Sequence, residues 1–268
     1  MFWRGVKRRR KVRIEYEDQD LLVVYKEAGL PVQTARTSRK DLVSLLKNHL
    51  MQTGKRETRK GEGTPEPYLG IVHRLDQPVE GLLVFAKTPK SASALSRQAA
   101  SKEGMEKVYQ AIVCLDAASY PMAIEGMKRE VTLVDWLGRD TASNTAYITS
   151  ENEKGAKRAE LVFRTLWIRE SRALLEIRLL TGRHHQIRIQ MAHAGMSLLG
   201  DRKYGDERND GTGKEVPSIK SAAEGTGKGQ PFARLCLCAC RLSFVHPVSG
   251  KKMQFIVEPT FSEEKSSD

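Results

Sequence analysis

Residues 70–87 read Gly-Ile-Val-His-Arg-Leu-Asp-Gln-Pro-Val-Glu-Gly-Leu-Leu-Val-Phe-Ala-Lys, a polar segment between two apolar runs. The second run, residues 82–86, is continuously apolar, as is typical of a strand buried on both faces. Pro78 and Gly81 bend the connection, because proline fixes φ and glycine tolerates unusual φ values. The stretch predicts a polar loop held between two buried strands, which is how rigid scaffolds often present reactive side chains.

The polar side chains of this loop admit two interpretations. Arg74 and Asp76 are two residues apart, so they could pair on one side of an extended segment. The tetrapeptide His-Arg-Leu-Asp at residues 73–76 is also short enough to occur by chance. Composition and spacing alone therefore leave a surface ion pair and a catalytic loop both open.

The complete stretch resembles the signature of the RluA-like pseudouridine synthases. In that family His-Arg-Leu-Asp is followed by two free residues, by Thr-Ser-Gly-Leu-Leu and then by Ala-Lys. The resemblance implies that Asp76 is the catalytic carboxylate. The chain departs from the pattern at Val79 and Glu80, which stand in place of the Thr-Ser pair.

Further segments resemble the same family in the same order along the chain, from about Glu17 to Val257. They are Lys26-Glu27-Ala28-Gly29-Leu30, Lys107–Val113, Thr181-Gly182-Arg183-His184-His185-Gln186-Ile187-Arg188, Gly200-Asp201-x-x-Tyr204-Gly205 and the closing strand Ala233–Val245. The chain departs at Glu27 (family Pro), His184 (family Thr) and Cys238 (family His). The resemblance implies an α+β fold with a mixed, mostly antiparallel sheet flanked by helices and a central active-site cleft.

The resemblance also implies roles for individual residues in isomerising uridine to pseudouridine in ribosomal or transfer RNA. Arg183 is expected to pair with Asp76 and to offset the rise in carboxyl pKa that burial causes. Tyr109 is expected to lie against the target base; without the resemblance, a core tyrosine is the plainer interpretation. Arg74 is expected to enter the gap that the extruded base leaves in the RNA.

Three more residues complete the expected RNA contacts: His73, Lys107 and Arg188. No cofactor and no metal are expected. His185 and His193 lack a companion ligand at metal-binding spacing, and His185 is interpreted as a structural, hydrogen-bonded histidine.

The charge balance favours a polyanionic partner. The chain has 45 Lys and Arg against 33 Asp and Glu, a net charge of +12. RNA is favoured over a membrane, because no strongly amphipathic basic helix is evident; a basic surface that serves solubility alone is the alternative. Residues 1–13 are basic without a following apolar region, so we expect no signal peptide and a cytoplasmic location. We also expect a monomer.

Composition shifts suggest the domain limits. We expect a basic tail at residues 1–14, a catalytic domain at 15–260 with flexible loops at about 52–67 and 206–230, and a polar tail at 261–268. The alternating Cys236, Cys238 and Cys240 are expected as reduced thiols on one face of a strand.

Hydrophobic periodicity predicts the regular elements outside residues 70–87. Strands are expected at 12–16, 21–25, 107–113, 131–137, 159–168 and 173–180, the last two joined by a hairpin at 169–171. Helices are expected from the start motif Ser38-x-x-Asp41 to about Met51, from Thr88-Pro89 through Ala99, and over 184–194.

Two other functions stay open at this level. The chain could be a catalytically silent RNA-binding protein of the same fold. It could also be a glycosidase-like hydrolase with Asp76 and Glu80 as a carboxylate pair.

Overall fold

The computed structural model describes residues 12–34, 40–53, 66–101, 104–205 and 234–261. Parts of the predicted tails, the two predicted loops and the candidate helix start at Ser38 lie outside these residues.

Eleven strands and four helices form in the described part of the chain. The strands are β1 (Arg13–Glu17), β2 (Leu21–Lys26), β3 (Gly70–Ile71), β4 (Glu80–Ala86), β5 (Glu106–Cys114), β6 (Val131–Asp140), β7 (Thr145–Thr149), β8 (Lys157–Arg169), β9 (Arg172–Leu179), β10 (Leu237–Val245) and β11 (Lys252–Ile256). The helices are α1 (Leu42–Thr53), α2 (Pro89–Ala100), α3 (Tyr120–Lys128) and α4 (Gln186–His193).

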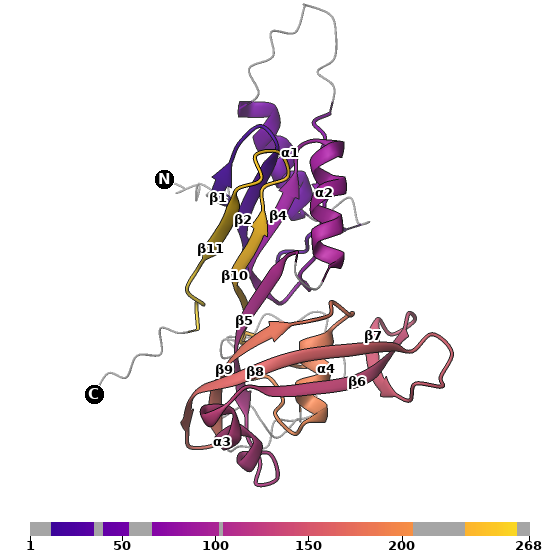
Figure 1. Ribbon diagram of the computed structural model, residues 1–268, viewed down its shortest axis with the longest axis vertical. Coiled ribbons are helices and arrows are strands. Elements are labelled where there is room, and N and C mark those ends of the chain that lie inside the picture. Colours follow the sequence, from indigo (N-terminus) through magenta and orange to yellow (C-terminus); the bar gives the residue numbers. More distant parts are fainter. Residues whose placement is uncertain (1–11, 35–39, 54–65, 102–103, 206–233, 262–268) are drawn as a thin grey trace, which may run out of the picture.

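All of these strands belong to one sheet that runs through two lobes. Hydrogen-bonded neighbours follow the order β1-β2-β4-β10-β5-β9-β8-β6-β7, with β11 beside β10 and β3 beside β4. Among these pairs only β4 and β10 are parallel. The predicted α+β fold with a mixed, mostly antiparallel sheet is confirmed. Figure 1 shows an upper lobe around β2 and β4, a lower lobe around β8 and β9, and β5 reaching from one to the other.

The upper lobe is organised by two strands that are buried on both faces. Every residue of β2 and β4 is buried, as the apolar run at 82–86 predicts. Alternate residues enter opposite cores: Leu22 packs in the core that α1 contributes to, and Leu21 in the core against which α2 packs. The lobe is therefore a three-layer sandwich with the sheet in the middle.

Both helices of the upper lobe begin at a side-chain cap. Asp41 Oδ1 accepts from the Ser44 N–H at 2.7 Å, directly before α1. Thr88 caps α2 by accepting from the Ser91 N–H at 3.1 Å, with Pro89 at the first helical position as predicted. The helix from Thr88-Pro89 is confirmed, and the helix predicted from the Ser38-x-x-Asp41 motif to about Met51 forms over Leu42–Thr53.

The central strand β10 joins the lobes, because it pairs with β4 on one side and with β5 on the other. Cys238 and Cys240 lie in one core cluster on the same face of β10, whereas Cys236 precedes the strand. All four cysteines of the chain are free and buried, so the prediction of buried thiols is confirmed.

The lower lobe contains the predicted hairpin and two elements that periodicity does not reveal. β8 and β9 pair up to Arg169 and Arg172, around Glu170 in a left-handed conformation with φ +50°. The short strand β7 and helix α3 were not predicted. Helix α4 starts at Gln186, two residues later than expected. No helix among the described residues is long and apolar enough to cross a membrane.

Candidate active site

The loop that carries Asp76 is fixed at both ends by the upper lobe. Asp76 accepts a turn hydrogen bond from the Val79 N–H at 3.1 Å, and the Gln77 carbonyl accepts from the Gly29 N–H at 2.8 Å. Gly81, the second residue of β4, has φ +121°, and a Cβ there would lie 2.4 Å from the Ala239 carbonyl oxygen. Only glycine permits this close approach of β4 to β10, so the sequence bends the loop where the sheet requires it.

A buried lysine ties the loop to β2. Lys26 is fully buried, and its Nζ donates to the carbonyl oxygens of Glu27 at 3.1 Å, Leu30 at 2.9 Å and Gln77 at 3.0 Å. Burial lowers the Lys26 pKa to about 8, while the charges of Asp76 and Glu80 act in the opposite direction. Because Gln77 directly follows Asp76, Lys26 positions the turn that carries the candidate catalytic residue.

The departures at Val79 and Glu80 form a different support for the same loop. Val79 is buried in the core that includes α1 residues. Glu80 is 3% exposed and accepts from the Thr260 N–H and the Thr260 hydroxyl, both at 2.8 Å. The carboxylate therefore attaches the start of β4 to the C-terminal segment. It does not line the pocket that Asp76 lines, which removes the support for a hydrolytic carboxylate pair.

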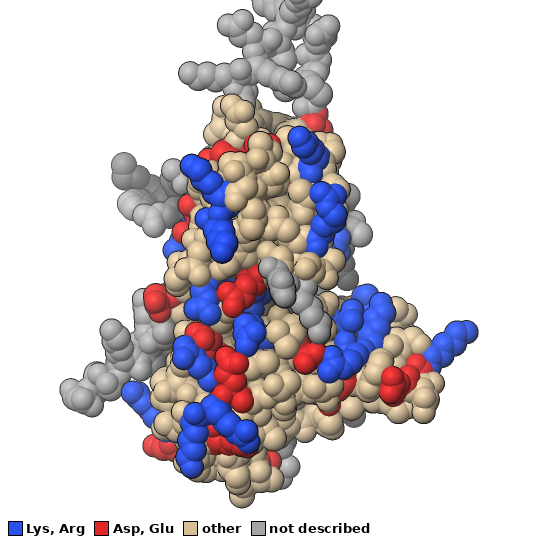
Figure 2. Space-filling view, in the orientation of Figure 1, with Lys and Arg blue, Asp and Glu red and all other residues tan. Residues whose placement is uncertain are grey.

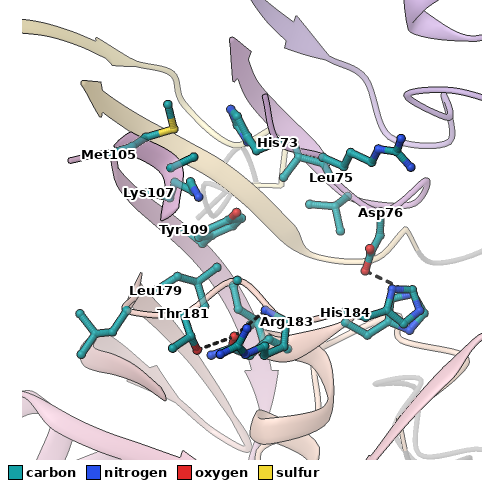
Figure 3. A pocket seen from close by; sticks show the side chains of 18 of the residues that line it. His73, Leu75, Asp76, Met105, Lys107, Tyr109, Leu179, Thr181, Arg183 and His184 are labelled. Carbon is teal, nitrogen blue, oxygen red and sulfur yellow. Dashed lines mark hydrogen bonds and ion pairs between the residues drawn. The ribbon is translucent and has the colours of Figure 1, made fainter. Parts of the chain in front are cut away.

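Asp76 opens into a pocket of about 720 Å³ between the two lobes. The upper lobe contributes residues 72–76, and the lower lobe contributes residues 179–188. Tyr109 from β5 lines the same pocket (Figure 3). The expected cleft across the middle of the fold is therefore present, with the candidate carboxylate and the candidate aromatic residue in it.

Two side chains of the lower lobe lie nearest the Asp76 carboxylate. Arg188 Nη1 and His185 Nε2 are each 3.5 Å from Asp76 Oδ2. Burial raises the Asp76 pKa, while Arg188, His184 and Lys26 act in the opposite direction. A carboxylate held in this way is poorly solvated but remains close to positive charge, as a group that must be ionised during a reaction requires.

The expectation that Arg183 pairs with Asp76 is wrong. Arg183 Nε donates to the Arg158 carbonyl oxygen at 2.9 Å, and its side chain is exposed at the rim of the pocket. In Figure 3 it lies beside Thr181, apart from the Asp76 carboxylate.

Arg188, which was expected to bind RNA, occupies the place next to the Asp76 carboxylate that was expected of Arg183. Arg188 is buried, and its Nε and Nη2 each hold an oxygen of Asp201 at 2.7 Å. That bidentate pair leaves Nη1 directed toward Asp76. Each nitrogen of Arg188 thus already faces a carboxylate and the side chain is buried, which does not favour the expected contact with RNA.

The local backbone conformation explains why Arg183, the first arginine of the motif, does not face Asp76. His185 has φ +52° in the left-handed region and reverses the chain before α4. His185 and Arg188 are then three residues apart at the start of the helix, so both face Asp76. Arg183 precedes the reversal. The spacing of His185 and Arg188 was the sequence signal that could have identified the pair.

The second ring nitrogen of His185, which does not face Asp76, is also hydrogen-bonded. Its Nδ1 lies 2.8 Å from the Tyr204 hydroxyl, which accepts from the Ala146 N–H at 2.7 Å. Burial, followed by the charge of Arg188, lowers the His185 pKa to about 3, so the ring is neutral. The predicted hydrogen bond of His185 is present, but the residue lies at the start of α4 beside Asp76, and its structural role stays a prediction.

Asp76, His184 and His185 bring three possible metal-ligand atoms within 4.8 Å of one another. The rings of His184 and His185 are stacked, with centroids 3.8 Å apart and planes 24° from parallel. Parallel stacked rings direct their lone pairs side by side rather than toward one point. A second such group, Asp18, Asp20 and His246, is internally paired, with His246 Nε2 2.8 Å from Asp18 Oδ2.

The remaining predicted residues lie around the upper part of the pocket. Tyr109 is 6% exposed, and burial raises the pKa of its hydroxyl. His73 Nε2 accepts from the Val84 N–H at 3.3 Å, which anchors the ring to β4. Lys107 lines the pocket, and burial lowers its pKa. Arg74 is exposed and donates to Gln33 Oε1 at 3.2 Å. The RNA contacts of Arg74, His73 and Lys107 stay predictions.

Comparison with known proteins assigns the family. Residues 20–193 match the RNA pseudouridylate synthase family model. The chain is 33% identical over 251 residues to the ribosomal large subunit pseudouridine synthase D of Zymomonas mobilis, covering 91% of this chain and 68% of that protein. It is 32% identical to an uncharacterized RNA pseudouridine synthase of Chlorobaculum parvum, with coverages of 91% and 69%.

Solved structures support the fold. Human RNA pseudouridylate synthase domain containing 4 superposes with a TM-score of 0.63 at 21% identity, over 93% of this chain and 89% of that one. The chain spans about two thirds of the length of the curated relatives. With the motifs and the family match in agreement, the chain belongs to the RluA-like family of RNA pseudouridine synthases.

Proposed function

We propose that this protein isomerises uridine to pseudouridine in ribosomal RNA, with Asp76 as the catalytic carboxylate. The observation that carries the proposal is the placement of Asp76 and Tyr109 in one pocket, with Arg188 next to the carboxylate. Ribosomal RNA is favoured over transfer RNA because relatives are named ribosomal large subunit pseudouridine synthase D. A cytoplasmic location and a monomeric state belong to the same proposal.

The reaction breaks the bond between ribose C1′ and uracil N1 and forms a bond between C1′ and C5. C5 loses its hydrogen as a proton, and N1 gains one, so no oxidant or external nucleophile is consumed. Asp76 acts in its ionised form at the ribose. Arg188 stabilises that charge, and its own geometry is fixed by Asp201.

Tyr109 and Arg74 have separate tasks in binding the substrate. A uridine stacked within RNA must be extruded, which costs a few kcal/mol. Stacking of the uracil on Tyr109 offsets part of that cost, by about 1–3 kcal/mol. Arg74 is exposed at the pocket and is the residue proposed to enter the vacated position in the RNA.

The test is tritium release from large-subunit ribosomal RNA transcribed with 5-tritiated uridine. The wild-type protein is expected to release label while the base stays attached to the ribose, and Asp76→Asn is expected to release none. Salt-sensitive binding without release would instead favour the catalytically silent alternative. Free uracil in the products would indicate a hydrolase. Mapping of pseudouridine at base resolution in the same RNA then identifies the uridine.

A further inference from the structure

A second pocket lies next to the catalytic one, on the far side of Arg183. Its volume is about 330 Å³. It is lined by residues 137–139 of β6, Tyr147 in the middle of β7, the turn after β7, Lys157 at the start of β8 and residues 182–184. Gly182, Arg183 and His184 line both pockets. A strand of RNA whose uridine occupies the catalytic pocket therefore has a continuous route into the second one.

The second pocket has an aromatic wall. Tyr147 pairs with Gly138 across β6 and β7, and a Cβ on Gly138 would lie 2.3 Å from the Tyr147 ring. The ring therefore lies over the glycine backbone, while the side chain is 39% exposed. Its hydroxyl donates to Glu153 Oε1 at 2.8 Å, which fixes the ring in place. A fixed ring with one supported side and exposed surface is suited to stacking of a base.

Positive charge surrounds this aromatic wall. Arg139, Lys154, Lys157 and Arg183 line the pocket, and none of its described lining residues is acidic. The nearest carboxylate to the ring, Glu153, is bonded to the Tyr147 hydroxyl. Figure 2 shows Lys and Arg side chains gathered over this part of the lower lobe, beside its junction with the upper lobe.

We infer that the second pocket binds the nucleotide next to the target uridine, with its base stacked on Tyr147 and its phosphate among Arg139, Lys157 and Arg183. The inference rests on the proposed function, because it takes RNA as the ligand. It adds a binding subsite that fixes the register of the strand. Arg183 then lies between two nucleotides, so its role is to bind the backbone and not to pair with Asp76.

Binding is measured in the Asp76→Asn background, which separates it from turnover. The probe is a single-stranded RNA heptamer with one central uridine. 2-Aminopurine replaces the nucleotide immediately 5′ or immediately 3′ of that uridine. Stacking on Tyr147 quenches the fluorescence of the probe whose label reaches the second pocket, and the other probe is the positional control.

Tyr147→Ala is expected to abolish this quenching and to weaken binding by at least about fivefold. Tyr147→Phe keeps the ring and is expected to restore most of both losses. Tyr120→Ala removes an exposed tyrosine on α3, outside both pockets, and is expected to bind like its parent. Lys157→Gln is expected to reduce the salt dependence of binding by about one ion. Thermal midpoints establish that each variant is folded at the temperature used.

Unchanged affinity and unchanged fluorescence of both probes in Tyr147→Ala would overturn the inference. This outcome is distinct from failure of the proposed function, which is measured as tritium release by the wild-type protein. In the active background Tyr147→Ala is expected to raise KM and to keep the wild-type kcat, because the subsite binds a non-reacting part of the substrate. A loss confined to kcat would also contradict it.

Discussion

Arg188 Nη1 lies 3.5 Å from Asp76 Oδ2, although the two residues come from different lobes and are 112 positions apart. The contact brings a guanidinium that is already fixed by its bidentate pair with Asp201 next to the candidate catalytic carboxylate. Burial raises the pKa of the Asp76 carboxyl group, and the positive charge of Arg188 acts to lower it. Chemistry at Asp76 therefore depends on how the lobes are joined as well as on the loop that carries it.

The two arginines of the motif are expected to differ when each is changed to lysine. Arg188→Lys cannot keep the fork on Asp201 and also reach Asp76, so kcat should fall by roughly tenfold, or about 1.4 kcal/mol in the barrier. The acidic limb of its pH profile should move to higher pH. Arg183→Lys should change KM and keep kcat. Steady-state kinetics on the same RNA checks both, and a larger kcat loss in Arg183→Lys would restore the original assignment.

Asp76→Asn is expected to abolish isomerisation and to stabilise the fold near neutral pH. Activity should fall by at least about 10²-fold, because the carboxylate takes part in the chemical step whether it attacks C1′ or removes a ribose proton. The folded pKa is raised, so the carboxyl contributes stability below its unfolded pKa and loses it as pH rises through the folded pKa. The thermal midpoint of the variant should exceed that of the wild type at pH 7, and the difference should shrink toward pH 4. A lower midpoint at pH 7 would contradict this.

Lys26 is expected to produce opposite effects of alkaline pH on activity and on stability. Its pKa is lowered to about 8, so above that pH the amine has fewer N–H donors than the three carbonyls it serves. The turn that holds Asp76 should loosen, and kcat should decline above about pH 8.

Stability should change in the other direction over the same pH range. The unfolded chain keeps the proton up to 10.5, so the unfavourable contribution of Lys26 to folding shrinks between about 8 and 10.5. Rates and denaturant midpoints measured across this window check both signs. Lys26→Met, which cannot titrate, is the control and should show neither dependence.

The attachment of Glu80 to Thr260 can be tested by removing one hydroxyl. Thr260→Val keeps the shape of the side chain but leaves Glu80 Oε2 without its donor. An unsatisfied buried acceptor costs about 1–3 kcal/mol of unfolding free energy. Thr260→Ser is the matched control, because it keeps the hydroxyl. If both variants unfold at the wild-type denaturant midpoint, Glu80 does not stabilise the loop through the C-terminal segment.

Local sequence patterns predicted the strands and the loop that carries Asp76, and the family motifs implied the fold. Continuous apolar runs identified β2 and β4, and proline and glycine located the loop between β3 and β4. The partner of Asp76 could not be chosen in the same way. Arg183 and Arg188 lie five residues apart in one motif, and only the left-handed turn at His185 decides which one faces the carboxylate.

Helix α3 shows a second limit of sequence patterns. Asp116 and Ser119 bond reciprocally just before it, and Pro121 lies in its first turn, so start signals are present. Gly126 weakens the helical pattern. It is needed because a Cβ there would lie 2.5 Å from Thr165 Oγ1 on β8. The contact with Thr165, which is distant in sequence, therefore requires glycine at position 126. Glycine has a low helix propensity, so the helical pattern of α3 is harder to recognise in the sequence.

The single sheet that passes through both lobes has a mechanical consequence. β10 and β5 are the strands through which one lobe is bonded to the other, and Asp76 and Arg188 lie on opposite sides of that connection. One hydrophobic cluster also crosses this connection, from Leu22 on β2 to Phe163 on β8, so packing as well as strand pairing fixes the separation of the two charges. Any change in the distance between Asp76 and Arg188 at this junction also changes the pKa of the Asp76 carboxyl group.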